Sequence, residues 1–201
     1  GYASTLNVTN GSLTNFGQLT AAAGDGGTRT IGAQLVNQSG GFIQVDAATT
    51  LARADAAHVN AALANIAVFG GNLTVTQTGT APTFTNNGTI NVAATRSFIG
   101  NGGTFELENG TMNGVTGIFQ TTGTTVARFQ PADVRPILTL SAGTTVPVAF
   151  VIPQGTDTVR VRNGTFAPTS LVNNGALLLE GTAIVNTASF TNGTTGLVRV
   201  Q

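Results

Sequence analysis

The stretch Phe84-Thr-Asn86-Asn-Gly88-Thr-Ile90 sets an asparagine and a glycine, with one residue between them, between two apolar residues. This short phrase recurs along the chain, and a longer form places three residues between its asparagine and its glycine. The asparagines are Asn15, Asn86 and Asn173 in the short form and Asn37, Asn113 and Asn192 in the long form. Each short copy is followed by a long copy, at offsets of 22, 27 and 19 residues (15 to 37, 86 to 113, 173 to 192). Repeats at this spacing are the sequence signature of proteins built from stacked coils.

Apolar residues alternate with polar ones beside these phrases, as in Thr89-Ile90-Asn91-Val92 and Leu197-Val198-Arg199-Val200. A period of two predicts strands with one buried face, and Asn-Gly pairs suit tight corners because both residues tolerate a positive φ. The sequence therefore predicts an all-β fold, a β-solenoid of the parallel β-helix kind, with stacked corner asparagines forming ladders. A β-sandwich of antiparallel hairpins, which would use the same Asn-Gly pairs, is the alternative.

We expect one repeat domain over residues 1–201, with two-coil units at about 13–45, 84–121 and 171–200. Two stretches interrupt the repeats. Residues 46–69 are rich in alanine, and the spacing of Val59, Ala62, Leu63 and Ile66 predicts a short helix near 54–67, with Asp55 as its N-cap. Residues 128–168 hold five of the six prolines, which predicts a β insertion with its prolines at corners or edges.

Charged residues make up only 8% of the chain, with eight acidic and eight basic side chains. This balance gives no basic surface for nucleic acid, and no apolar run reaches the roughly 20 residues of a membrane helix. We therefore expect no nucleic-acid partner and no membrane insertion. The chain has no cysteine, so neither disulfides nor thiolate metal sites are available to it.

Few side chains point to catalysis. His58 is the only histidine, and we expect it to be a solvated residue on the face of the predicted helix rather than a catalytic base. Glu106 and Glu108 are two residues apart and would share one strand face, where paired carboxylates could cleave glycosides. The other acids are scattered singly, so we expect a solvated outer face, no enzyme activity, no metal and no cofactor.

The phrases Phe84-Thr-Asn-Asn-Gly-Thr-Ile-Asn-Val92 and Leu171-Val-Asn-Asn-Gly-Ala-Leu177 resemble the repeats of large bacterial β-strand-repeat surface proteins, which include adhesin-type solenoids and autotransporter passengers. The resemblance implies secretion, an extracellular or cell-surface location, and a role in surface attachment or extracellular structure. It specifies the architecture and leaves the ligand open.

We expect a secreted, non-catalytic subunit of an extracellular filament or surface layer, in which copies pair head to tail through open end strands. The expected pairing strands contain Leu6 and Val8 at one end and Leu197, Val198 and Val200 at the other. In that arrangement, deletion of residues 194 to 201 should abolish assembly. The alternative is an adhesin or phage tail-fibre segment that binds glycans or a host surface, and a third possibility is a polysaccharide-cleaving β-helix enzyme.

Overall fold

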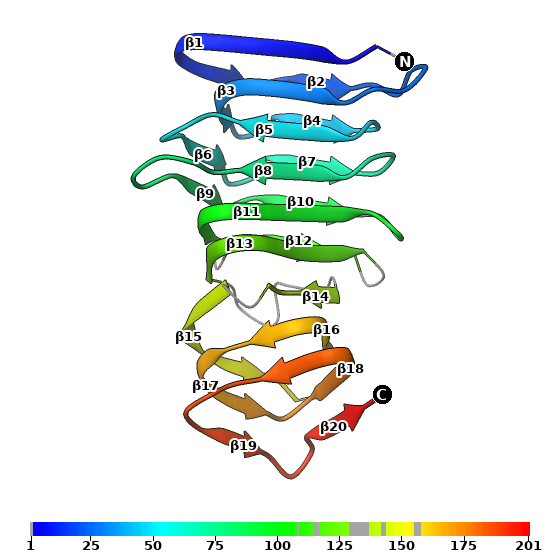
Figure 1. Ribbon diagram of the computed structural model, residues 1–201, viewed down its shortest axis with the longest axis vertical. Helices are drawn as coiled ribbons and strands as arrows, with labels where there is room; N and C mark the ends of the chain where they lie inside the picture. The colour runs from blue at the N-terminus through cyan, green and yellow to red at the C-terminus, as the bar shows by residue number, and fades with distance from the viewer. Residues whose placement is uncertain (1, 108, 115–116, 129–136, 142–143, 155–157) are drawn as a thin grey trace.

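The computed structural model describes residues 2–107, 109–114, 117–128, 137–141, 144–154 and 158–201. These residues form a parallel β-solenoid, and the part of the chain that is described contains no helix (Figure 1). The strands are β1 (Ser4–Asn15), β2 (Gln18–Ala21), β3 (Arg29–Asn37), β4 (Phe42–Val45), β5 (Thr49–Ala52), β6 (Ala57–Asn60), β7 (Asn65–Val68), β8 (Leu73–Thr76), β9 (Thr83–Asn86), β10 (Thr89–Val92), β11 (Ser97–Glu106), β12 (Thr111–Asn113), β13 (Ile118–Arg128), β14 (Ile137–Thr139), β15 (Thr144–Ile152), β16 (Thr158–Phe166), β17 (Pro168–Asn173), β18 (Ala176–Val185), β19 (Phe190–Asn192) and β20 (Leu197–Val200). The predicted all-β solenoid is confirmed, and the β-sandwich alternative does not describe this chain.

The strands stack in columns along the long axis of the molecule (Figure 1). The first column pairs, in order, β1, β3, β5, β8, β11, β13, β14, β16, β18 and β20. Several of these strands bend at mid-length, and their second halves form a second column with β6 and β9. The third column is a separate sheet of β2, β4, β7, β10 and β12. Further along the chain, β15, β17 and β19 form a ladder of their own.

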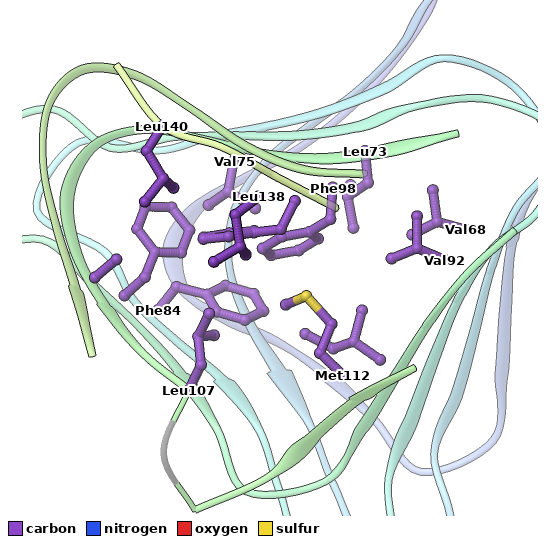
Figure 2. Packing of buried hydrophobic residues seen from close by; sticks show 14 of the residues in the cluster. Val68, Leu73, Val75, Phe84, Val92, Phe98, Leu107, Met112, Leu138 and Leu140 are labelled. Atoms are coloured by element: carbon purple, nitrogen blue, oxygen red, sulfur yellow. The ribbon is translucent and has the colours of Figure 1, made fainter. Parts of the chain in front are cut away.

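Alternate residues of each strand point into the coil and build one continuous apolar core. In the middle coils this core is aromatic: the ring centroids of Phe84 and Phe98 lie 5.3 Å apart, and those of Phe98 and Phe119 lie 5.9 Å apart. Figure 2 shows Phe84 and Phe98 beside Met112 in the interior. The first coils instead use aliphatic residues such as Ile31 and Val45. The side chains that fill the core are therefore larger in the middle coils than in the first coils.

The predicted helix near 54–67 is wrong, because these residues form β6 and β7 with a corner between them. Asp55 and Leu63 have positive φ values of 53° and 65°, which no helix allows, and Leu63 is 86% exposed. Val59 lies on an outer strand face, whereas Ile66 is buried on the next column. The apparent helical spacing arises because a corner separates two short strands with a period of two.

The proline-rich stretch 128–168 includes residues outside those described, among them Pro131 and Pro136. Its described strands take part in the stack, since β14 pairs with β13 and β16, and β15 pairs with β13 and β17. Pro147 falls where the β15–β17 register shifts, between Val146 and Ala149. A proline has no N–H to donate to a ladder, so it fits at such an irregularity.

Candidate functional site

Asparagine side chains form a buried ladder at the corner between the second and third columns. Each Nδ2 group donates to the Oδ1 atom of the next coil: Asn15 to Asn37, Asn37 to Asn60, and Asn60 to Asn86, all at 2.8 Å. The sequence reasoning missed Asn60 because it lay inside the predicted helix. The signal was present, however, since Asn60 stands 23 residues after Asn37, one coil length along.

The ladder also holds the backbone of the neighbouring column. Asn37 donates to the carbonyl oxygen of Asn65, and Asn60 to that of Thr89, each at 3.2 Å. Every buried amide therefore satisfies both a side chain and a main-chain acceptor, which fixes the direction of the corner. The row ends at Asn86. Thr85 pairs with Glu106 in the next coil, so the residue stacked on Asn86 is Leu107, whose side chain has no amide to continue the row.

The remaining predicted corner asparagines lie elsewhere. Asn173 donates to Asn192 at 2.7 Å, and both end strands that lead back into the first column. Asn113 also precedes a first-column strand, and it donates to Asn91 at 3.0 Å in an outer, partly exposed row. One sequence phrase thus serves two different corners, which explains why its offsets are irregular.

The glycine of the phrase is required where its coil packs on a preceding coil. A Cβ atom at Gly41 would lie 2.4 Å from the Asn37 Oδ1 atom, and one at Gly88 would lie 2.4 Å from two backbone carbonyl oxygens. At Gly17, in the first coil, nothing lies within 4 Å of the same position. The asparagines and glycines of the phrase are therefore scaffold residues.

His58 is fully buried, and its prediction as a solvated residue is wrong. Its Nδ1 atom accepts the backbone N–H of Leu35 at 3.1 Å, so the neutral ring carries its proton on Nε2, which has no hydrogen-bond partner among the described residues. Desolvation by burial lowers the pKa of His58 from 6.5 to about 4. His58 is therefore a neutral core residue that accepts the backbone N–H of Leu35, and no carboxylate among the described residues is its partner.

The predicted carboxylate pair is only half described, because Glu108 lies outside the described residues. Glu106 is partly buried and accepts a hydrogen bond from the Thr85 hydroxyl at 3.3 Å. Among the described residues, no three His, Cys, Asp or Glu side chains gather closely enough to hold a metal ion. Within the same residues there is also no helix that could cross a membrane.

The N-terminal end of the solenoid contains an apolar cavity of about 550 Å³. Its walls are core side chains of the first coils, including Leu6, Leu19, Ile31 and Ile43. Arg29 also lines it, but its guanidinium group already donates to four backbone carbonyl oxygens between residues 2 and 27. The cavity is lined mainly by apolar side chains and therefore suits an apolar group.

The C-terminal end exposes residues that elsewhere would be core. Phe190 pairs in register with the buried Leu171, and Val198 with the buried Leu177, so both point inward. They are nevertheless 46% and 37% exposed.

The residues predicted to join copies lie at the two ends. Leu6 (44% exposed) and the half-buried Val8 belong to β1, whereas Leu197 (54%), Val198 and Val200 (77%) belong to β20. The structure therefore places the two predicted halves of the contact at opposite ends of the stack (Figure 1). No protein-family model, no curated protein and no solved structure matches this chain.

Proposed function

We propose that the chain is a secreted, non-catalytic structural unit of an extracellular filament or surface layer, in which copies stack head to tail by strand pairing. The observation that carries the proposal is the pair of open ends. Among the described residues, β1 and β2 pair on one side only, and so do β19 and β20. Unpaired strand edges are templates for another chain, and contacts between two different surfaces of identical subunits extend into filaments.

The apolar content of the two ends supports the same proposal. One end has a hollow lined by Leu6 and Leu19, and the other presents Phe190, Val198 and Val200. Burial of apolar surface favours association by about 25 cal/mol per Å². Low charge also helps, because eight acidic and eight basic residues leave no net charge to keep copies apart.

The interior supports a structural role over a catalytic one. The described core is filled by phenylalanine and aliphatic side chains, and its buried asparagines Asn37, Asn60 and Asn86 are engaged in the ladder. The one titratable group in the core of the described residues, His58, is held neutral by burial. Such an interior gives mechanical continuity along the axis.

Negative-stain electron microscopy and sedimentation velocity of the 201-residue chain, across a concentration series, test the proposal. We expect filaments that lengthen with concentration, and discrete particles at every concentration would refute it. Phe190→Asp should suppress assembly because it places a charge on the apolar end. Thr191→Asp is the matched control, since Thr191 is the next residue, is also exposed and points outward.

A second candidate, an adhesin or tail-fibre segment that binds glycans or a host surface, is favoured by three exposed aromatic side chains. Tyr2, Phe16 and Phe69 are 89%, 73% and 50% exposed. Aromatic rings in such positions offer an apolar face and, in tyrosine, a polar edge for a ligand. A glycan array with the unmodified chain, repeated with Phe16→Ala and Phe69→Ala, tests this candidate.

A further inference from the structure

Four of the eight Asn-Gly pairs of the chain continue as Asn-Gly-Thr, and they begin at Asn87, Asn109, Asn163 and Asn192. An asparagine followed by glycine can react with its own backbone, because the glycine has no Cβ atom to shield its nitrogen. That nitrogen attacks the asparagine Cγ atom, and ammonia leaves as a succinimide ring closes. The reaction requires an asparagine side chain that is free to turn and a glycine N–H that is not engaged. Differences in reactivity among copies of one tripeptide therefore report their surroundings in the fold.

Two of these asparagines, Asn163 and Asn192, are exposed but held by hydrogen bonds. The Asn192 Oδ1 atom accepts the Asn173 amide at 2.7 Å, and its Nδ2 group donates to a backbone carbonyl oxygen at 2.9 Å. The N–H of the following Gly193 donates to the carbonyl oxygen of Asn173 at 2.8 Å. At the other corner, the Asn163 Oδ1 atom accepts the backbone N–H and the hydroxyl group of Thr182 at 3.1 and 3.3 Å. These hydrogen bonds must break before either Cγ atom can meet the glycine nitrogen.

Asn87 lies at the corner between β9 and β10, in the middle of the stack, and it is exposed without such restraints. Its backbone N–H donates to the Asn60 carbonyl oxygen at 2.8 Å, but its side chain has no hydrogen-bond partner among the described residues. The Gly88 N–H likewise donates to no acceptor in the described part of the chain. The fourth copy, at Asn109, adjoins Glu108, which lies outside the described residues. Asn87 and Gly88 therefore meet both requirements of the reaction.

We propose that Asn87 is a modification site at which the folded chain deamidates spontaneously, whereas the fold protects Asn163 and Asn192. The Gly88 nitrogen gives up its proton and forms the new C–N bond, and the Cγ–Nδ2 bond of Asn87 breaks as ammonia departs. Water then opens the succinimide at either of its carbonyl carbons, which gives aspartate or isoaspartate at position 87. One water molecule is consumed, one ammonia is released, and the chain gains one negative charge.

An isoaspartate at this corner would disturb the buried asparagine ladder. In isoaspartate the main chain runs through the side-chain carbons, so the corner becomes longer. The corner has no room for this, because a Cβ atom on Gly88 would already lie 2.4 Å from two backbone carbonyl oxygens of the coil beneath. The next residue, Thr89, supplies the carbonyl oxygen to which Asn60 Nδ2 donates at 3.2 Å. Modification of Asn87 therefore acts on a contact between two coils.

Peptide mapping by mass spectrometry, after the folded chain has been kept warm at mildly alkaline pH, tests the proposal. We expect Asn87 to convert at least about tenfold faster than Asn163 and Asn192, since hydrogen bonds must first break at those two corners. The same chain in denaturing urea is the matched control, and there the three copies should react at similar rates. Similar rates in the folded chain, or no conversion of Asn87, would overturn the proposal.

Two variants test the effect on the corner. Asn87→Gln keeps the amide but closes the corresponding larger ring far more slowly, so it should remove the acidic species that forms on incubation. Asn87→Asp carries the charge of the product without lengthening the main chain. We expect the isolated isoaspartyl form to unfold at a lower urea concentration than Asn87→Asp does. Equal midpoints would overturn the inferred effect on the ladder, and persistence of the acidic species in Asn87→Gln would overturn the assignment of the site.

Discussion

Replacement of Asn60 by alanine is the sharpest test of the ladder. Asn60 is completely buried; it accepts from Asn37 and donates to the Oδ1 atom of Asn86 and the carbonyl oxygen of Thr89. Alanine removes both donors and also the acceptor of the Asn37 amide, so buried polar groups on both sides lose a hydrogen-bond partner. Each unpaired buried group costs about 1–3 kcal/mol, so we expect Asn60→Ala to lower the free energy of unfolding by about 3–5 kcal/mol.

Asn91 provides the matched control because it has the same place in a different row. It donates to Asn65 at 3.0 Å and accepts from Asn113 at 3.0 Å, but this row is partly exposed. Water can replace the lost hydrogen bonds there, so Asn91→Ala should cost only about 1 kcal/mol or less.

Urea unfolding followed by far-UV circular dichroism measures both variants, with the slope of the transition checked for change. A shift in midpoint at constant slope reports stability. If Asn60→Ala destabilises the chain no more than Asn91→Ala, the buried row is not what holds the corner, and the reasoning from burial fails.

Three other measurements probe the core and the coil contacts. Because burial lowers the pKa of His58 from 6.5 to about 4, the unfolded chain binds this proton at a higher pH than the folded chain does. The free energy of unfolding should therefore fall by about 3 kcal/mol as the pH drops from about 6.5 to about 4, and His58→Phe should remove that part of the pH dependence. Gly88→Ala should cost about 2–3 kcal/mol through its 2.4 Å clash, whereas Gly17→Ala should stay within about 0.5 kcal/mol in the same urea assay. Arg53→Ala should speed amide hydrogen exchange in β1 with a change of about 1 kcal/mol or less in stability, because its guanidinium donates to two backbone carbonyls of that strand at 2.8 and 2.7 Å.

Local periodicity was enough to predict the all-β solenoid and several of its strands. Alternation around Ile90 and Val92 indicates an inward face, and both residues are buried. Between Asp55 and Ile66 the same reasoning failed, because a corner between two strands of four residues shifts the alternation and imitates helical spacing. Solvation of His58 was inferred from that helix, so one misplaced element produced two errors.

The corner phrase predicted turns well but not their positions around the coil. Asn37 leads from the second column into the third, whereas Asn113 and Asn192 lead back into the first. An Asn-Gly corner needs only residues that tolerate a positive φ and a hydrogen-bond acceptor in the neighbouring coil. The corner into the third column and the corner back into the first column both meet these needs. The phrase therefore predicts that the chain turns, but it does not predict which two columns the turn connects.

The place of β20 in the stack is set by the fold as a whole rather than by its own residues. β20 pairs with the first half of β18 and so belongs to the first column, and this pairing follows from the order in which the chain passes through the columns. No window of sequence around Leu197 contains that information. The residues of β20 read as a good pairing strand, which led to the expectation that its loss abolishes assembly. That expectation stays a prediction, which the assembly of a chain without residues 194–201 tests.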